Sequence, residues 1–229
     1  MSLPSTSPNC GPRRDGLRPS LIVLHYTAMA SADEALERLC DPVAEVSAHY
    51  LIARTGEVLQ LVDEAERAWH AGAGSWGGQG DVNSRSIGIE LDNDGFSPFP
   101  APLMTSLEGL LPGIMERCSI RAEGVIAHSD MAPTRKCDPG RRFDWLRLAR
   151  QGLAVWPNEP MASGAADANA FLGQASQFGY DVTLPLDQVL DAFRQRFRPF
   201  AHGPLTGADT EAITDLAARF PVDRARLSA

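Results

Sequence analysis

The sequence predicts an α/β protein with a mixed central β-sheet flanked by helices, followed by a small three-helix domain. Short apolar runs alternate with longer stretches of helical spacing over residues 20–157, which is the pattern of a layered sheet. The pattern changes near the stretch VWPNEPMASGA, and three amphipathic segments follow. We therefore expect a flexible N-terminal segment (1–19), a main domain (20–157), a linker (158–165) and a helical domain (166–229).

The expected strands come from three kinds of pattern. Segments 20–27 (SLIVLHYT) and 123–128 (EGVIAH) are continuous apolar runs, typical of strands buried on both faces. Segment 85–93 alternates between apolar and polar residues, as a strand with two different faces does. Segment 48–63 consists of two strand-like runs around a Thr-Gly pair, which predicts a hairpin.

Helices are expected wherever apolar residues recur at helical spacing. In the main domain these segments are 31–40 and 103–118, and in the helical domain they are 166–178, 185–197 and 208–219. Ser31 stands where a side chain would cap the first helix.

The composition excludes several classes of protein. The 229 residues are 44% hydrophobic and 22% charged, which is ordinary for a globular protein. The formal net charge of −8 argues against a nucleic-acid-binding protein, which normally has a basic face. The cysteines are scattered without a CxxC pair, so neither a disulfide scaffold nor a cysteine-rich metal site is expected.

No segment is apolar over the roughly 18 residues that a transmembrane helix needs. The first twenty residues contain no apolar core of the kind found in signal peptides. Cys10 is not preceded by a hydrophobic stretch and does not resemble a lipoprotein anchor. We therefore expect no transmembrane segment.

Two histidines each end a short apolar strand, His25 in LIVLH and His128 in VIAH. If these strands are parallel neighbours, their carboxyl ends meet where open α/β sheets bind ligands. Asp138 follows ten residues after His128. Two imidazoles and one carboxylate form a common catalytic zinc site with a fourth position open. The alternative is that both histidines are ordinary hydrogen-bonded residues at strand ends.

Glu90 lies in the middle of an expected strand, on its polar face. A carboxylate inside a central strand is costly unless it has a partner. Water activated by a metal would be such a partner, because Glu90 could take its proton and later return it to a leaving amine. The alternative is a solvated face, which Asp92 and Asp94 at the end of the strand would suit.

Lys136 lies two residues before Asp138, so in an extended segment both side chains project to the same side. Its ammonium group could then stabilise an oxyanion near the metal. An ordinary loop lysine beside Arg135 is the alternative.

Cys137 could be a soft zinc ligand or a nucleophile. The same alternation would turn Cys137 away, so Asp138 is favoured as the ligand.

The remaining histidines differ in their surroundings. His70 lies in a loop rich in Trp and Gly (RAWHAGAGSWGG), which suits either the wall of a sugar or peptide cleft or simple loop packing. His49 opens a strand and is expected to be structural, whereas His202 in the helical domain is expected to be incidental. Asp130 is expected to cap a helix or to bond within its loop.

Six stretches occur together and in a characteristic order: VLHYTA, SAHYLIARTGEVLQLV, RAWHAG, NSRSIGIELDN, AHSDMAPTRKCDPG and FDW. In these stretches, covering about residues 20–157, the chain resembles the type 2 zinc-dependent N-acetylmuramoyl-L-alanine amidases. The resemblance implies the fold of bacteriophage T7 lysozyme and the peptidoglycan-recognition proteins. It is strongest to the AmpD and AmiD branch, in which aspartate is the third metal ligand.

Residues 166–226 resemble a three-helix peptidoglycan-binding domain through FGYDV, AFRQRFRP and GADTEAI. The LARQGLAVWP stretch before them is similar to AmiD-like members of the family. The resemblance to the peptidoglycan-binding domain rests on shorter motifs than the resemblance to the amidases.

The resemblance implies one zinc ion per chain, held by His25, His128 and Asp138. It also implies that Glu90 activates the water and that Lys136 stabilises the tetrahedral intermediate. The reaction implied is hydrolysis of the amide between N-acetylmuramic acid and L-alanine of the stem peptide. The substrate would be peptidoglycan or its 1,6-anhydro-muropeptide breakdown products.

Motif positions implied to line the substrate cleft are Tyr26, His70 and Asn83. Three nearby arginines, Arg135, Arg141 and Arg142, are expected to be solvated, with pairing to stem-peptide carboxylates as the alternative.

AmiD-like proteins usually carry a lipoprotein leader, and none stands at the start of this sequence. We therefore expect a cytoplasmic role in muropeptide recycling, with the periplasm or outer membrane as the alternative if a leader has been removed. A non-catalytic wall-binding protein is a competing hypothesis, but the presence of every candidate ligand and catalytic residue favours an enzyme. A thiol hydrolase using Cys137 is a further hypothesis.

Overall fold

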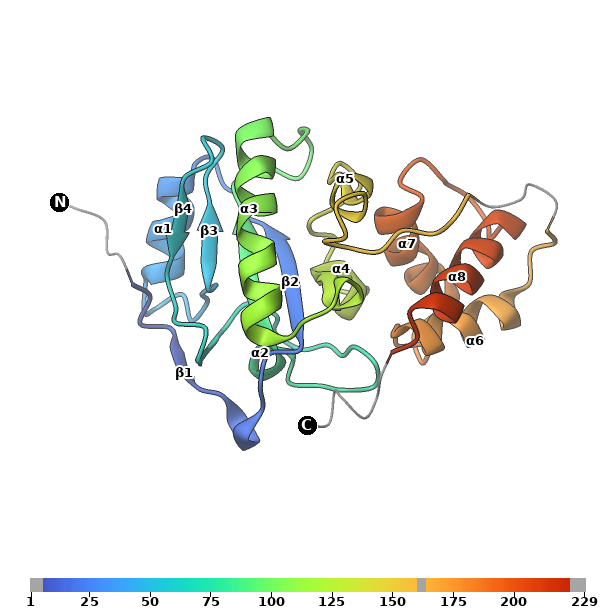
Figure 1. Ribbon diagram of the computed structural model, residues 1–229, viewed down its shortest axis with the longest axis horizontal. Coiled ribbons are helices and arrows are strands. Elements are labelled where there is room, and N and C mark those ends of the chain that lie inside the picture. Colours follow the sequence, from blue (N-terminus) through green and yellow to red (C-terminus); the bar gives the residue numbers. More distant parts are fainter. Residues whose placement is uncertain (1–5, 160–163, 223–229) are drawn as a thin grey trace.

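The computed structural model describes residues 6–159 and 164–222 (Figure 1). The outermost residues of the expected N-terminal segment and helical domain, and part of the expected linker, lie outside these ranges. The strands are β1 (Cys10–Pro12), β2 (Leu21–Tyr26), β3 (Tyr50–Ile52), β4 (Val58–Gln60), β5 (Glu66–Ala68), β6 (Ser86–Leu91) and β7 (Val125–Ala127). The α-helices are α1 (Ala32–Cys40), α2 (Val82–Arg85), α3 (Ala101–Cys118), α4 (His128–Met131), α5 (Trp145–Ala149), α6 (Ala168–Phe178), α7 (Leu186–Phe197) and α8 (Gly207–Arg219).

The central sheet has five strands in the order β4-β3-β6-β2-β7. Strand β2 is parallel to both of its neighbours, β6 and β7, and β3 is parallel to β6. Strands β3 and β4 form the antiparallel hairpin expected within 48–63. The mixed sheet predicted from the sequence is therefore confirmed.

Both faces of the sheet are buried, as the continuous apolar runs predicted. Ile22 and Leu24 of β2 belong to the same apolar cluster as Leu107 of α3. Leu21 and Val23, which alternate with them, belong to a second cluster on the opposite face. Figure 1 shows α3 lying across the first face. The second face is the one that carries the candidate site.

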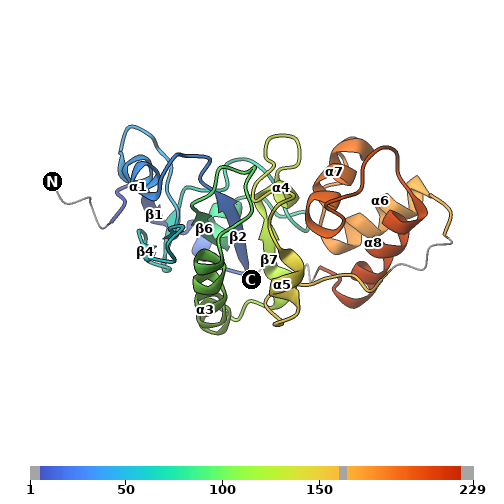
Figure 2. The same ribbon diagram turned by 90° about the horizontal axis from the view of Figure 1, so that it is seen from above.

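The helical domain packs directly against the sheet. Val23 and Ile126 share an apolar cluster with Phe178, Phe193 and further residues of α6, α7 and α8. Figure 2 shows these three helices grouped at one end of the molecule, next to β7 and α4. The expected helices at 166–178, 185–197 and 208–219 are thus confirmed, and they share a hydrophobic core with the main domain.

The described part of the N-terminal segment differs from the flexible arm that was expected. Strand β1 pairs antiparallel with β5. Asn9 is buried, and its Nδ2 donates to the carbonyl oxygens of Asp41 and Val46 at 2.8 Å. The segment is therefore held by backbone pairing with β5 and by polar side chains that bond to loop carbonyls. Such contacts leave no apolar periodicity in the sequence.

Local capping explains where the first helix begins. Ser31 Oγ accepts a hydrogen bond from the backbone N–H of Glu34 (3.2 Å), as the sequence predicted. The short helices α2, α4 and α5 were not expected, since four or five residues are too few to show a period. Among them, α4 changes the site, because His128 begins a helix and does not end a strand.

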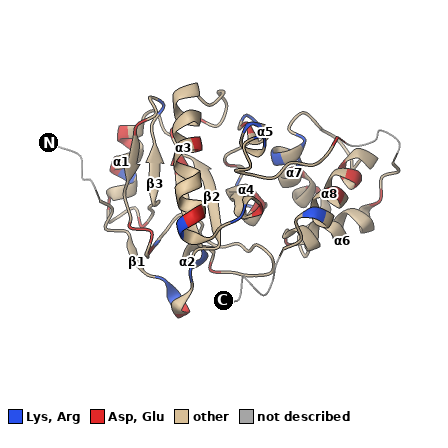
Figure 3. Cartoon of the chain, viewed as in Figure 1, with Lys and Arg blue, Asp and Glu red and all other residues tan. Residues whose placement is uncertain are grey.

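Charged residues are spread over both parts of the molecule (Figure 3). Acidic and basic residues are scattered along the ribbon in both parts, and the coloured segments do not form one long basic run. No helix in the described ranges combines the length and apolar character needed to span a bilayer.

Candidate active site

Three side chains lie in a row across the carboxyl ends of neighbouring strands. His25 of β2 pairs in register with Glu90 of β6. On the other side of β2, Leu24 pairs with Ala127 of β7, so His128 comes next to His25. Because paired residues of parallel strands point to the same face, His25 and Glu90 project together from the face opposite α3.

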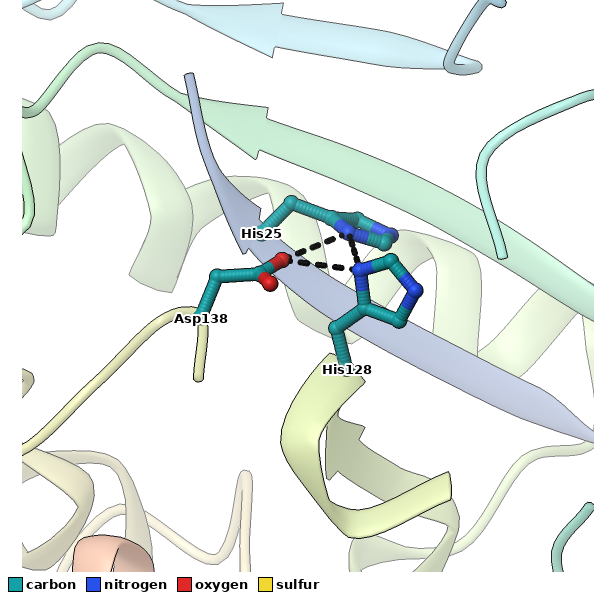
Figure 4. Close-up of side chains that lie close together, drawn as sticks. All are labelled: His25, His128 and Asp138. Atoms are coloured by element: carbon teal, nitrogen blue, oxygen red, sulfur yellow. Dashed lines mark hydrogen bonds and ion pairs between the residues drawn. The ribbon is translucent and has the colours of Figure 1, made fainter. Parts of the chain in front are cut away.

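His25, His128 and Asp138 bring three potential ligand atoms together (Figure 4). The Nδ1 atoms of the two imidazoles are 2.8 Å apart, and each lies 2.9 Å from Oδ2 of Asp138. All three residues are buried. Asp138 reaches this point because the loop after α4 turns back, and its carbonyl accepts from the N–H of Ser129 (3.0 Å).

The hydrogen bonds behind His25 determine which of its ring nitrogens carries a proton. The hydroxyl of Ser86 donates to the carbonyl of Val82 (2.5 Å), so its oxygen accepts from Nε2 of His70 (3.1 Å). Nδ1 of His70 is then the acceptor for Nε2–H of His25 (3.0 Å). The Nδ1 of His25 is left with a lone pair that faces the other two ligand atoms.

His128 has the same tautomer for a different reason. Its Nε2 lies 2.9 Å from the carbonyl oxygen of Ala71, which can only accept, so the proton is on Nε2 and Nδ1 is bare. Burial, followed by the neighbouring His128, lowers the pKa of His25 to about 4, so His25 is neutral at pH 7.

Three lone pairs therefore face one another with no proton between them, and a cation completes such a cluster. Two imidazole nitrogens and a carboxylate oxygen are a donor set found in catalytic zinc sites. Tetrahedral zinc with bonds of about 2.0–2.2 Å separates its ligand atoms by about 3.3–3.6 Å. The three atoms here are 2.8–2.9 Å apart, so a small outward movement of the side chains would accommodate the ion. Nε2 of His25 bonds to His70, and Nε2 of His128 bonds to the carbonyl oxygen of Ala71. Zinc-bound histidines almost always have such a supporting hydrogen bond at the ring nitrogen that does not bind the metal. The residues thus fit a zinc ion.

Glu90 lies beside this cluster without a partner of its own. Its Oε2 is buried and has no hydrogen-bond partner among the described residues. Burial is the main cause that raises the pKa of Glu90 well above its ordinary value, and the charge of Asp138 adds to it, whereas Lys136 lowers it. A half-buried carboxyl with a perturbed pKa next to a candidate metal site is typical of a general acid or base.

The cluster opens into a cleft with a volume of about 510 Å³, a size suited to a small ligand. Lys136 and Cys137 are exposed at its rim. The Sγ of Cys137 lies 3.1 Å from the hydroxyl of Tyr26. The expected alternation therefore keeps the thiol out of the candidate ligand set, but it does not turn the thiol out of the cleft.

The three residues expected to line a substrate cleft have different positions. Tyr26 and His70 both line it. Asn83 does not, which corrects the expectation. Asn83 is buried, and its Oδ1 accepts from the backbone N–H groups of His70 (3.0 Å) and Ala71 (2.8 Å). It supports the loop that carries both outer partners of the candidate metal ligands.

Two of the three arginines are bound where solvated side chains were expected. Arg135 donates to the carbonyl oxygens of Ala71 (3.1 Å) and Ala73. Arg141 pairs with Asp191 of α7 (2.5 Å), away from the cleft. Both bind groups that come from distant parts of the sequence. Arg142 is exposed, in agreement with the expectation.

The other two histidines are where the sequence predicted them. His49 is buried, and its Nδ1 accepts from the N–H of Gly88 (2.9 Å), which is a structural role. His202 is exposed in the helical domain.

The sequence did not reveal the residues that orient the candidate ligands, above all Ser86 and Gly88. A glycine inside a strand often marks a close approach of another group, and this signal was available for Gly88. A Cβ built on Gly88 would lie 2.4 Å from Cγ of His70. Gly88 therefore makes room for the imidazole that orients His25.

We expect Gly88→Ala to lower both stability and metal affinity. The methyl group has to displace His70, and overpacking of this kind costs about 1–3 kcal/mol. Urea unfolding and competition with a metal chelator measure the two effects. Gly109→Ala is the matched control, because Gly109 lies in α3 and its Cβ would meet nothing within 4 Å. Unchanged metal affinity in Gly88→Ala would show that His70 does not orient the site.

Comparisons with known proteins agree with this geometry. The profile of the N-acetylmuramoyl-L-alanine amidase family matches residues 15–141. The chain is 37% identical over 228 residues to N-acetylmuramoyl-L-alanine amidase AmiD of Escherichia coli K12, covering 86% of this chain and 82% of AmiD. It is 35% identical over 159 residues to 1,6-anhydro-N-acetylmuramyl-L-alanine amidase AmpD of Haemophilus influenzae, covering 62% of this chain and 86% of AmpD.

Solved structures are similar over nearly the whole chain. The complex of Escherichia coli AmiD with anhydro-N-acetylmuramic acid-L-Ala-D-gamma-Glu-L-Lys has a TM-score of 0.81 at 33% identity, covering 97% of this chain and 93% of AmiD. AmpDh3 of Pseudomonas aeruginosa in complex with an anhydromuramic pentapeptide has a TM-score of 0.79 at 28% identity, covering 90% of this chain and 93% of AmpDh3. With its fold, its profile match and these relatives, the chain belongs to the N-acetylmuramoyl-L-alanine amidase family.

Proposed function

We propose that this protein is a zinc-dependent amidase that cleaves the bond between 1,6-anhydro-N-acetylmuramic acid and L-alanine of the stem peptide. The observation that carries the proposal is the convergence of three bare lone pairs, on His25, His128 and Asp138, beside an unpartnered glutamate in an open cleft. A protein that only binds peptidoglycan has no need for a glutamate with a buried carboxyl oxygen that lacks a partner, which is costly to maintain. This favours catalysis over binding alone.

The three candidate ligands would hold one zinc ion per chain. Zinc, when bound, supplies a Lewis acid that polarises the scissile carbonyl and lowers the pKa of water. Glu90 takes the proton of the attacking water and delivers it to the nitrogen of L-alanine, which leaves as an amine. Because the pKa of Glu90 is raised, its carboxyl is suited to hold that proton between the two steps.

Lys136 is the residue proposed to stabilise the developing oxyanion. It lines the same cleft as Glu90, and its positive charge acts on the pKa of that carboxyl. It is also the only lysine in the chain, whose other basic side chains, apart from histidine, are all arginines. A compact ammonium group at this position suits a localised oxyanion charge.

The substrate proposal draws on the relatives. AmiD and AmpDh3 were solved in complex with anhydromuramic peptides, so we assign the same class to this chain, with Tyr26 and His70 on the cleft wall. The test is digestion of purified sacculi and of anhydro-muropeptides in parallel, with mass spectrometry of the products. Release of free stem peptide with N-terminal L-alanine is expected from anhydro-muropeptides. Release only from sacculi would contradict the substrate assignment, and release from neither would contradict the reaction.

The division of the chain is part of the proposal. We assign catalysis to residues 20–157, a linker to 158–165 and a peptidoglycan-binding-like domain to 166–229. A cytoplasmic place of action follows from soluble muropeptides as substrates, and cell fractionation tests it. Co-sedimentation with sacculi, in an excess of soluble anhydro-muropeptide, distinguishes glycan binding by the helices from capture in the cleft.

A thiol mechanism is the second candidate, because Cys137 is exposed in the cleft. Its Sγ contacts the hydroxyl of Tyr26, and no general base within the described residues is seen to bond to it. We therefore expect Cys137→Ser to retain its rate within about twofold, as exposed substitutions usually do. Steady-state hydrolysis of an anhydro-muropeptide is the measurement. An inactive variant that is folded and loaded with metal would favour the thiol mechanism.

A further inference from the structure

Asp130, which the sequence left without a clear role, connects the candidate metal site to the helical domain. It lies in α4, the short helix that begins with His128. Its Oδ2 accepts from the N–H of Ala127 (2.9 Å), which fixes the junction where β7 ends and α4 begins. The orientation of His128 therefore depends on where Asp130 is held.

Two side chains from the helical domain hold Asp130 in place. Nη1 of Arg196 in α7 donates to its Oδ2 (2.6 Å), and the hydroxyl of Tyr180, just after α6, donates to its Oδ1 (2.6 Å). Nη2 of Arg196 also donates to the carbonyl of Val125 in β7 (2.8 Å). One guanidinium group thus binds both the strand that leads to His128 and the helix that starts there.

This contact is buried and lies between aromatic rings. The side chains of Arg196 and Asp130 are both 0% exposed. The guanidinium carbon lies 4.4 Å from the ring centre of Trp145 and 4.7 Å from that of Phe197, so aromatic rings restrict it as well. A planar group held by paired hydrogen bonds and stacking defines the position of its partner more closely than a flexible ammonium would.

We propose that Arg196 and Tyr180 are positioning residues for the metal site: through Asp130 they fix the start of α4 and with it His128. The inference rests on the proposed metal site. It gives the helical domain a role inside the catalytic unit that is separate from any binding of the cell wall. The domain then acts on the site through β7 and α4, and within the described residues it forms no hydrogen bond or ion pair with the candidate ligands.

The test uses the full-length protein and measures zinc affinity by competition with a chromophoric chelator, together with the absorption spectrum of the cobalt-substituted protein. We expect Arg196→Met to weaken zinc binding about 10- to 100-fold, the range seen when groups that support metal ligands are removed. Tyr180→Phe, which removes a single hydroxyl and is expected to fold, should weaken binding by a smaller factor. Arg196→Lys should bind zinc more tightly than Arg196→Met but less tightly than the unaltered protein. In Arg196→Met and Tyr180→Phe, the factor by which kcat falls should be larger than the factor by which KM changes.

Arg194→Met is the matched control. Arg194 forms a buried ion pair with Asp209 (2.5 Å), both residues lie inside the helical domain, and their hydrogen bonds and ion pairs within the described residues do not involve α4. We expect both Arg194→Met and Arg196→Met to unfold at lower urea concentration than the unaltered protein, whereas the zinc affinity and cobalt spectrum of Arg194→Met stay unchanged.

Two results would overturn the inference. Native zinc affinity and cobalt spectra in both Arg196→Met and Tyr180→Phe would reduce their contacts to a structural role. An equal loss of zinc affinity in Arg194→Met would trace the effect to general destabilisation. Absence of zinc binding in the unaltered protein would instead contradict the proposed metal site itself, so the two failures are distinguishable.

Discussion

Replacing Glu90 by glutamine is expected to lower amide hydrolysis by about 10²- to 10⁴-fold, the usual contribution of a general acid–base group. Glutamine preserves the shape of the side chain but can neither accept a proton from water nor deliver one to the leaving nitrogen. The Oε2 of Glu90 has no partner among the described residues, so the substitution breaks no hydrogen bond that the structure shows at this atom. Zinc content and the urea midpoint should therefore remain close to those of the unaltered protein.

The measurement is single-turnover hydrolysis of an anhydro-muropeptide by the metal-loaded variant. Asp92→Asn is the matched control, since Asp92 lies just beyond the same strand and is buried, but pairs with Arg54 (3.1 Å) and does not line the cleft. It should keep its activity per folded molecule. Full activity in Glu90→Gln would remove Glu90 from the mechanism, whereas loss of zinc would make it a structural residue.

Asp138→Ala is expected to weaken zinc binding by more than about 100-fold, because removing outer supporting groups alone weakens metal binding 10- to 100-fold. Asp138 is the only carboxylate in the candidate ligand set. Its loss leaves two neutral imidazoles, whose lone pairs lack the negative charge that a divalent cation favours. Hydrolysis should fall with the metal, because the attacking water would no longer be activated.

Metal analysis after dialysis, followed by activity assays over a range of added zinc, tests this expectation. Asp94→Ala is the control, because Asp94 is an exposed carboxylate whose hydrogen bonds stay within its own loop. One zinc ion per chain in Asp138→Ala, with binding as tight as in the unaltered protein, would rule Asp138 out as a ligand. Activity restored by millimolar zinc would support the expected loss of affinity.

The sequence predicted much of the fold, because burial leaves a direct trace in the order of residues. The apolar run before His25 and the alternation around Glu90 both result from strands in the middle of a sheet. The two candidate histidine ligands could be predicted as well, since His25 lies near the end of β2 and His128 directly follows β7. Once neighbouring strands are parallel, their carboxyl ends lie at the same edge of the sheet, so no further sequence signal is needed to bring these residues together.

Other features were decided only by the tertiary structure, because they depend on groups distant in the sequence. The proton on His25 is placed by a chain of hydrogen bonds through His70 and Ser86. Asn83 was expected on the cleft wall, but in the structure it is buried and accepts hydrogen bonds from two backbone N–H groups.

The sequence by itself determined the central sheet, the longer helices and the chemical types at the site, since local patterns and short spacings are enough to specify them. The tertiary structure decided tautomers, partners and the link from Asp130 to Arg196. These depend on where a buried polar group finds its donor or acceptor, and that partner can come from any part of the chain. The proposed zinc site is therefore visible in the sequence, while the contacts that orient it appear only in the folded protein.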